Sequence, residues 1–393
     1  MEITNDIKYV GVNDYQIDLF ESQFKVPNGM SYNSYIILDE KIAVMDSVDA
    51  SFGEQWINNI KSILKSQAQN STPDYLIVHH MEMDHSANIQ LFMNEFPSAK
   101  IVASKMAFSI MKNLFGTDFP ENQIIVGEGS VLQLGKHNLS FVAAPNVHWP
   151  EVVLSYDTAD KVLFSADAFG KFGALNDNEN ITNWDDEARR YYFGIVGKFG
   201  NFVQPVLKKL SSLKVEKICP LHGPVLSENL EHYINLYDTW SSYKPEQNGV
   251  FIAYTSVYGH TEQAVQKLAQ LLIDRGCNNV ITADLARNDM SKCIEDAFKY
   301  NHLVLATTTY AGDIFPFMKE FIIQLTERNF QNRKIALIEN GSWVPNAAKV
   351  MTSLFASSKD ISFTSSKVTI KTAMNAQTLK DLEAMADEIL AVQ

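Results

Sequence analysis

The sequence predicts two domains: an α+β domain of short strands and helices, followed by an α/β domain built on a doubly wound parallel sheet. Three observations predict this. At 393 residues the chain is longer than one hydrophobic core usually serves. A polar link, KPEQNG (244–249), separates an aromatic-rich helical stretch from an apolar strand. The order of strands and helices differs on its two sides, so we place the domains at residues 1–248 and 249–393.

The first domain mixes strand-like runs with helical patterns. Residues 34–46, SYIILDEKIAVMD, predict a hairpin that turns at 39–41. A helix is expected at 52–66, where apolar residues recur at helical spacing. Apolar runs bounded by turn residues predict further strands at 73–80, 99–105, 138–145 and 151–167.

The second domain alternates strands and helices more regularly. Strands are expected at 249–256, 301–309 and 334–340, and helices at 261–276, 315–328 and 379–391. Such β–α alternation is typical of a doubly wound parallel sheet.

Charge and composition exclude several classes of function. The formal net charge is −13, which argues against nucleic acid as a partner because phosphate binding needs clustered Lys and Arg. Residues 1–248 hold 31 acidic and 19 basic residues, whereas residues 249–393 hold 15 and 14, so the acidity belongs to the first domain. The apolar runs are shorter than the ~20 residues that a membrane helix needs. We expect a cytoplasmic protein without a membrane partner, because the N-terminus lacks the pattern of a signal or transit peptide.

The three cysteines, Cys219, Cys277 and Cys293, are isolated from one another and have no CxxC spacing. They predict neither a disulfide framework nor an iron–sulfur site, and we expect them to be small buried side chains.

A dense group of metal-ligating side chains follows the strand at 75–78. His80, Glu82, Asp84 and His85 stand within six positions in the stretch HHMEMDH. Three later strand ends add His148, Asp167 and His222. Unpaired buried charges are costly unless they bind a metal or a counter-charge, so the set predicts a dinuclear metal site.

This spacing resembles the flavodiiron proteins, whose first domain has a metallo-β-lactamase-like αββα fold. The hydrolases of that superfamily have a second His where this chain has Glu82, and a hard anionic oxygen ligand favours iron over zinc. The resemblance implies one iron on His80, Glu82 and His148. It implies a second iron on Asp84, His85 and His222, with Asp167 bridging the two. Met83 replaces the proline usual in the family, and we expect it to change loop stiffness and not ligation.

Other side chains near these ligands have open assignments. His79 is off the ligand spacing and is expected to be a structural residue at a strand end. Asp46 either orients a ligating His or caps a turn. His137, His232 and His302 are expected to be surface or hydrogen-bonded residues. Trp149 and the aromatic stretch 189–194 either shield the site or belong to the core.

The first β–α junction of the second domain predicts an anion site. Its loop, SVYGHT (256–261), is rich in small and hydroxyl residues and opens a helix whose N–H groups and dipole favour phosphate. The loop resembles the phosphate loop of flavodoxins, and two later strand ends lie where flavodoxins flank the flavin ring. Tyr310 and Trp343 are candidates to contact that ring, and Gly312 and Gly341 allow close backbone approach. The expected FMN-binding residues are Ser256, Val257, Tyr258, Gly259, His260, Thr261, Thr308, Thr309, Tyr310, Ala311, Gly312, Asn340, Gly341, Ser342 and Trp343.

The resemblance implies an oxidoreductase that reduces O₂ to water or NO to N₂O at the diiron site, with electrons passed through FMN. Reduction of O₂ is the favoured reaction. The alternatives are a nitric oxide reductase, a deazaflavin-dependent oxidase and, more remotely, a dinuclear zinc hydrolase. The 393 residues contain no CxxC…CxxC module, so an external donor such as rubredoxin is expected, docking on the less acidic second domain. Family members imply a head-to-tail homodimer or a dimer of dimers.

Overall fold

The computed structural model describes residues 2–65, 71–175 and 184–391. The chain divides into two compact units, Met1–Asp238 and Thr239–Gln393. The division falls inside helix α7 (Leu230–Ser241), and the functional boundary near residue 248 stays a prediction.

The first unit contains two sheets packed face to face. The six-stranded sheet has the order β1 (Ile7–Tyr9), β6 (Tyr35–Ile37), β7 (Ala43–Met45), β8 (Tyr75–Ile77), β9 (Lys100–Ser104), β10 (Gln123–Val126). The five-stranded sheet has the order β11 (Val131–Gln133), β12 (Asn138–Ala143), β13 (Val153–Asp157), β14 (Val162–Phe164), β15 (Lys217–Cys219). One apolar cluster, which includes Met45, Ile77, Phe141 and Phe164, joins the two sheets.

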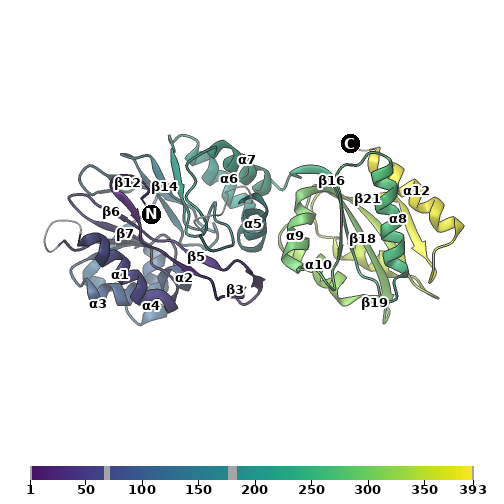
Figure 1. Cartoon of the computed structure of the whole chain (residues 1–393), viewed down its shortest axis with the longest axis horizontal. Coiled ribbons are helices and arrows are strands. Elements are labelled where there is room, and N and C mark those ends of the chain that lie inside the picture. The colour runs from purple at the N-terminus through teal and green to yellow at the C-terminus, as the bar shows by residue number, and fades with distance from the viewer. Residues whose placement is uncertain (1, 66–70, 176–183, 392–393) are drawn as a thin grey trace. The chain divides into compact units, whose positions relative to one another are not determined.

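Helices cover the sheets of the first unit on their outer sides. Figure 1 shows α1 (Gly53–Leu64), α3 (Ile89–Glu95) and α4 (Lys105–Phe115) together beside the first sheet. Helices α5 (Trp184–Tyr191), α6 (Gly200–Leu210) and α7 lie beside the second. The expected αββα arrangement is therefore confirmed. Two small antiparallel pairs, β2 (Val12–Asp14) with β5 (Met30–Tyr32) and β3 (Leu19–Phe20) with β4 (Phe24–Lys25), complete the unit.

Local sequence explains where these elements turn and stop. The hairpin expected at 34–46 is the antiparallel pair β6–β7. Trp56 of α1 is fully buried against Phe92 of α3 and donates its indole N–H to Ser34 Oγ, 2.9 Å away. Ser104 caps α4 by accepting the N–H of Ala107, and the helix ends at Gly116, which has φ +74°.

Parallel strands place the ligand candidates at common sheet edges. Strands β7, β8 and β9 are parallel neighbours, as are β14 and β15. The loop that follows β8 carries His80 to His85, and the loops that follow β14 and β15 carry Asp167 and His222. Since parallel strands end at the same edge, residues far apart in sequence meet there.

The second unit is a parallel sheet with helices on both faces. Its order is β17 (Val280–Asp284), β16 (Gln247–Tyr254), β18 (Tyr300–Tyr310), β20 (Arg333–Asn340), β21 (Ile361–Ile370), and β19 (Asp313–Ile314) pairs antiparallel with β18. Numbered along the chain, this is the flavodoxin-like order 2-1-3-4-5, whose switch point lies between β16 and β18. The expected doubly wound sheet is confirmed.

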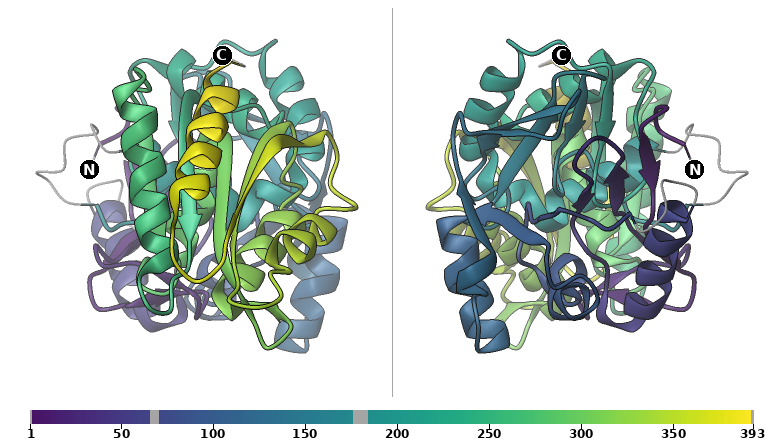
Figure 2. Two further views of the ribbon diagram at one scale, coloured as in Figure 1. Left: turned by 90° about the vertical axis from the view of Figure 1, so that its right-hand side faces the viewer. Right: turned by 90° about the vertical axis from the view of Figure 1, so that its left-hand side faces the viewer.

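The helices of the second unit pack in two layers. Helices α8 (His260–Asp274) and α12 (Ala376–Leu390) lie side by side on one face (Figure 2, left) and share an apolar cluster with the sheet. The remaining helices are α9 (Met290–Lys299), α10 (Pro316–Glu327) and α11 (Ala347–Leu354). Phe321 of α10 contacts Phe251 of β16, which places α10 against the sheet.

Nowhere in the described ranges does a helix combine the length and apolar character needed to cross a membrane. All three cysteines are buried, as expected, and none of them forms a disulfide bond.

Candidate metal centre and cofactor pocket

The seven expected metal ligands lie together at one edge of the first unit. The chain leaves β8, and the short helix α2 (Met83–Ser86) then carries Asp84 and His85 in a single turn. His80, His85 and His222 are at most 1% exposed, and Asp167 is 2% exposed. Met83, at the position usually occupied by proline, starts α2 and is exposed, so its side chain does not enter the cluster.

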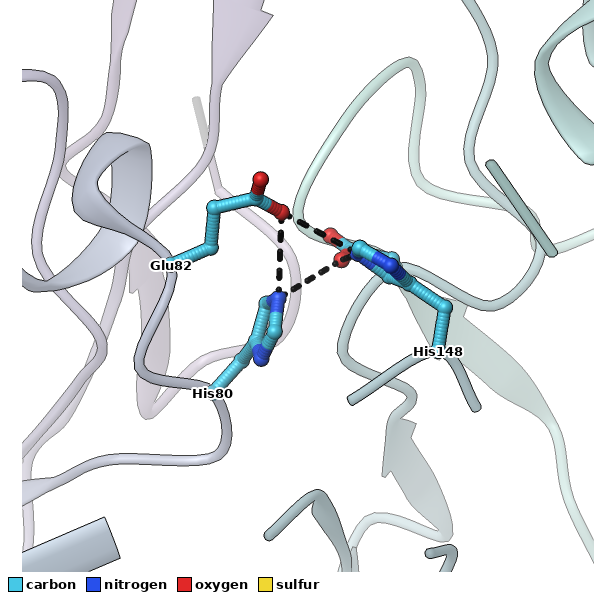
Figure 3. Close-up of side chains that lie close together, drawn as sticks. His80, Glu82 and His148 are labelled. Atoms are coloured by element: carbon cyan, nitrogen blue, oxygen red, sulfur yellow. Dashed lines mark hydrogen bonds and ion pairs between the residues drawn. The ribbon is translucent and has the colours of Figure 1, made fainter. Parts of the chain in front are cut away.

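The first group of ligand atoms comprises His80, Glu82, His148 and one oxygen of Asp167. His148 Nε2 lies 3.1 Å from Glu82 Oε2 and 3.0 Å from Asp167 Oδ2. His80 Nε2 lies 3.3 Å from each of the same two oxygens. Figure 3 shows His80 and Glu82, from the loop after β8, pointing toward His148, which comes from a separate segment. Neighbouring ligands about 2.1 Å from one metal ion lie about 3 Å apart, so the spacing suits a single ion.

The second group comprises Asp84, His85 and His222. His222 Nε2 is 3.0 Å from His85 Nε2 and 3.2 Å from Asp84 Oδ2. Asp167 joins the two groups: its Oδ1 lies 3.7 Å from His222 Nε2, while its Oδ2 faces the first group. A carboxylate that presents one oxygen to each group is placed to bridge two ions.

Orphaned buried atoms test whether these residues fit metal ions. Within the part of the chain that the structure describes, both carboxylate oxygens of Asp84, and Oδ1 of Asp167, are buried and have no hydrogen-bond partner. His148 Nε2 is likewise without an aligned partner, although carboxylates lie close to it. Buried anionic oxygens without donors are unfavourable unless cations neutralise them. Three carboxylates and four imidazoles match the mixed oxygen and nitrogen set that iron accepts.

The electrostatics of the cluster also favour cations. Burial opposes protonation of His148, but the nearby carboxylates of Asp167 and Glu82 overcome it and raise the pKa of His148 to about 9. Burial likewise opposes ionisation of Asp167, yet the imidazoles around it hold its pKa well below the ordinary value. The carboxylates therefore favour protonation of His80, His148 and His222 when no metal is bound, whereas burial lowers the pKa of His85. Because ligating His must be neutral, a metal ion would displace these protons.

Two buried groups outside the expected set contact the ligating imidazoles. Glu151 is 3% exposed, and its Oε1 lies 2.9 Å from His80 Nδ1 and accepts the N–H of Met81 at 2.9 Å. The carbonyl of Ser31 lies 2.7 Å from His222 Nδ1. Each contact fixes the ring so that Nε2 faces the cluster. The sequence did not identify Glu151 as a partner of a ligand, although its position three residues after the expected ligand His148 pointed to the site.

His79 and Asp46 form a separate buried network. Asp46 Oδ2 lies 2.5 Å from His79 Nδ1, and Ser155 Oγ on β13 lies 2.7 Å from His79 Nε2. Asp46 also accepts the N–H of His79 at 2.7 Å. Asp46 therefore holds His79 and not one of the ligand candidates, and the network links the two sheets directly beneath the ligand loop.

Other side chains noted in the sequence lie around or away from the cluster. Trp149 stands edge-on to His80, with ring centroids 5.1 Å apart. Glu21, at the tip of the β3–β4 hairpin, interacts with Glu82; burial and that neighbouring charge raise the pKa of Glu21 to about 7. His137 is buried between Asp157 and Asp6, His302 is buried, and His232 contacts Asp185.

The second unit has a pocket of about 510 Å³ at the carboxyl ends of β16, β18 and β20. Its volume is within the ~300–1,000 Å³ usual for small-molecule sites. All the expected FMN-binding residues line it except Gly259, which lies in the same loop. Three lining residues were not expected: Val344, Asn346 and Thr372. Thr372 follows β21, whose pattern had not predicted a strand.

Hydrogen bonds between loops fix the walls of this pocket. Thr309 Oγ1 accepts the N–H groups of Asn346 and Ala347 at 2.9 and 3.1 Å. Asn340 and Thr372 exchange two hydrogen bonds, Asn340 Nδ2 to Thr372 O and Thr372 N–H to Asn340 Oδ1, both 3.1 Å long. The pocket is therefore shaped before a ligand enters.

The pocket fits a planar aromatic ligand with a phosphate. Ser256 Oγ accepts the N–H groups of Gly259 and Glu262, which shapes the loop at the start of α8. Trp343 is 87% and Tyr258 88% exposed, so large ring faces are open to a ligand. Gly259 has φ +86°, a backbone conformation that favours glycine.

A family model and a curated relative match this chain. Residues 30–223 match the family described as ODP family beta lactamase. An anaerobic nitric oxide reductase flavorubredoxin of Salmonella arizonae is 28% identical over 351 residues, which cover 87% of this chain and 72% of that protein.

Solved structures share the fold over nearly the whole chain. The rubredoxin oxygen:oxidoreductase from Desulfovibrio gigas has a TM-score of 0.91 and 23% identity, with 100% of this chain and 98% of that chain covered. The flavodiiron protein from Giardia intestinalis also has a TM-score of 0.91 and 23% identity, with 99% and 95% covered.

Proposed function

We propose that this chain, a member of the flavodiiron protein family, is an oxidoreductase that reduces O₂ to water at a non-haem diiron site with electrons passed through FMN. The observation that carries the proposal is the pair of joined ligand groups, four imidazoles and three carboxylates, which Asp167 connects. Reduction of NO to N₂O is the second candidate, favoured by the similarity to a flavorubredoxin named for that activity.

The proposed metal ligands are His80, Glu82, Asp84, His85, His148, Asp167 and His222. Two irons held there would supply exchangeable electrons and open positions for a diatomic gas. The seven side chains bind and space the ions, and Asp167 sets their separation. Three anionic oxygen ligands stabilise the more highly charged oxidised state, which suits a strong oxidant such as O₂.

The proposed FMN site is the pocket of the second unit. The N-terminus of α8 and the hydroxyl of Thr261 bind the phosphate, while the loops after β18 and β20 hold the flavin ring. Tyr310, 51% exposed, and Trp343 contact the ring. FMN would accept electron pairs and pass them on singly.

The overall reactions define what the chain must receive. Reduction of O₂ to two waters consumes four electrons and four protons, and reduction of two NO to N₂O and one water consumes two of each. We propose that a separate carrier such as rubredoxin supplies the electrons, and that a head-to-tail homodimer or a dimer of dimers brings the flavin of one chain to the diiron site of another.

The test is anaerobic reduction of protein containing iron and FMN, followed by consumption of O₂ and NO at matched concentrations with one donor. Faster O₂ consumption, with two irons per chain, supports the proposal. Faster NO consumption with N₂O produced would replace O₂ by NO as the substrate. Glu82→Ala should abolish gas consumption and retain FMN. Two zinc ions and no gas consumption would overturn the proposal in favour of a hydrolase.

A further inference from the structure

The two metal positions have equal inner charge but different outer partners. Each position has two imidazoles, one carboxylate of its own and one oxygen of Asp167. The directly contacting atoms therefore do not distinguish the two ions. Any difference must come from the groups that contact the ligands.

At the first position a buried carboxylate supports His80. Glu151 Oε1 lies 2.9 Å from His80 Nδ1, and Glu151 Oε2 is buried with no hydrogen-bond partner in the described ranges. Oε1 also accepts the N–H of Met81 at 2.9 Å. Few donors therefore disperse the negative charge of Glu151, and much of it acts on the His80 ring. A carboxylate on one ring nitrogen makes the other nitrogen a stronger electron donor to a metal.

At the second position the outer partners are neutral or absent. His222 Nδ1 contacts the carbonyl oxygen of Ser31 at 2.7 Å. The Nδ1 atom of His85 is buried and has no hydrogen-bond partner among the described residues. The rings of Tyr32, Phe20 and Tyr191 pack against His222 with centroids 5.8, 5.4 and 5.5 Å away. None of these rings carries a negative charge that would act on the second position.

We infer that the two iron positions are unequal, and that Glu151, acting through His80, makes the position of His80, Glu82 and His148 the tighter one and the first to be oxidised. Glu151 is a positioning residue, because it touches a ligand and not the metal. The inference rests on the proposed diiron function. The electron lost in this oxidation goes to the chemical oxidant of the titration or, in turnover, to the gas.

The test is a redox titration of the iron-loaded holoprotein with ferricyanide and mediators, followed by electron paramagnetic resonance. In the wild type we expect two separated one-electron steps. In Glu151→Gln the hydrogen bond can persist without the negative charge. The equilibrium constant for oxidation of the first iron should then fall at least tenfold, which raises the lower midpoint potential by about 59 mV or more. In Glu151→Gln, chelator competition should show one of the two irons bound about 10–100-fold more weakly than in the wild type.

Asp157→Asn is the matched control. Asp157 is a fully buried carboxylate 2.9 Å from His137 Nδ1 in the same unit, and neither residue belongs to the two groups of expected iron ligands. This variant should leave both midpoints unchanged. Glu151→Asp keeps the negative charge but, with its shorter side chain, places it farther from His80. It should therefore raise the lower midpoint potential less than Glu151→Gln does. It provides the comparison with wild type if Glu151→Gln fails to fold.

The outcomes separate this inference from the proposed function. Two irons with midpoints that Glu151→Gln does not change, or that Asp157→Asn changes equally, would overturn the inference and leave the diiron function standing. If only Glu151→Asp folds, a lower midpoint potential above that of wild type supports the inference, and midpoints identical to those of wild type overturn it. Absence of iron from the wild-type protein would overturn the proposed function itself.

Discussion

At the scale of single residues, the ligand loop depends on buried polar partners that are not themselves ligands. Asp46, His79 and Ser155 are each at most 1% exposed and form one hydrogen-bonded chain from the first sheet to the second. Asp46 also has φ +55°, which is unusual for a residue other than glycine. The network therefore fixes the point where the chain leaves β8 and turns toward His80.

Ser155→Ala tests the energetic importance of this network. The substitution leaves His79 Nε2 buried without a partner, so the free energy of unfolding of the first unit should fall by about 1–3 kcal/mol. Chemical denaturation followed by the fluorescence of Trp56 and Trp184 measures the change. Iron content should stay at the wild-type level, because Ser155 contacts no ligand. A stability within error of wild type would show that the network adds nothing.

Glu82→His tests the contribution of ligand hardness. An imidazole in place of the carboxylate removes one anionic oxygen from the first group, so preference should move from iron toward zinc. We expect the ratio of bound iron to bound zinc to fall about tenfold, or about 1.4 kcal/mol, when apoprotein is offered both ions in equal amounts. Met83→Leu is the control, since Met83 is exposed beside the same ligands. An unchanged ratio would mean that geometry and not ligand type selects the metal.

At the scale of elements, the loops around the flavin pocket depend on one another. Thr309, near the end of β18, accepts the N–H groups of Asn346 and Ala347 and so caps helix α11, which follows the loop after β20. The two loops proposed to hold the flavin ring are thereby joined through the Thr309 hydroxyl, and a longer bond from Asn346 Nδ2 to Gly312 O, 3.4 Å, also links them.

Thr309→Val should loosen this joint with little change in side-chain volume. Loss of one cap costs about 1 kcal/mol, so the affinity for FMN should fall about fivefold. Fluorescence titration of apoprotein with FMN measures it. Thr326→Val, whose hydroxyl bonds within α10 far from the pocket lining, is the control. Equal affinities for all three proteins would contradict the proposed coupling.

Helix α12 is fastened to the edge strand β21 by one carboxylate. Glu388 accepts four hydrogen bonds from the N–H groups and hydroxyls of Ser365 and Ser366, at 2.7 to 2.9 Å. Partial burial opposes ionisation, but these bonds prevail and hold the pKa of Glu388 at about 2.

This lowered pKa predicts a pH dependence. A carboxyl with a lower pKa in the folded state stabilises the fold above its unfolded pKa, near 4.5, and loses that effect as the pH falls toward 2. Glu388→Gln should therefore be less stable than wild type at pH 7, and the difference should shrink between pH 5 and 3. Thermal melting across this range measures it. A difference that grows on acidification would contradict the assignment.

The elements that sequence predicts well are those with a strong burial pattern. Strands β8, β14 and β16 are apolar runs because they are buried, and their ends mark where ligands gather. Strands β17 and β21 were missed because they are edge strands with partly exposed residues and no continuous apolar run. Thr372 was missed with β21. Glu151 was missed because its role depends on His80, 71 positions away in the sequence.

At the scale of the whole molecule, charge is unevenly divided between the two parts. The excess of acidic residues lies in residues 1–248, while residues 249–393 are nearly neutral. The proposed flavin pocket is in the nearly neutral part, where an acidic electron carrier meets less repulsion. Lys349 on α11 and Lys371 beside Thr372 are exposed near this pocket.

Reversing these two charges should slow the entry of electrons. In Lys349→Glu/Lys371→Glu, reduction of FMN by an acidic rubredoxin should be roughly tenfold slower at low salt, because both changes weaken electrostatic steering. Stopped-flow absorbance of the flavin measures the rate. The difference should shrink at about 0.5 M salt, where exposed charges are screened. Lys359→Glu is the matched control, because Lys359 is exposed at the start of β21, the opposite end of the strand from Lys371. A rate that is the same in all three proteins, or equally slow in the control, would mean that the carrier docks elsewhere.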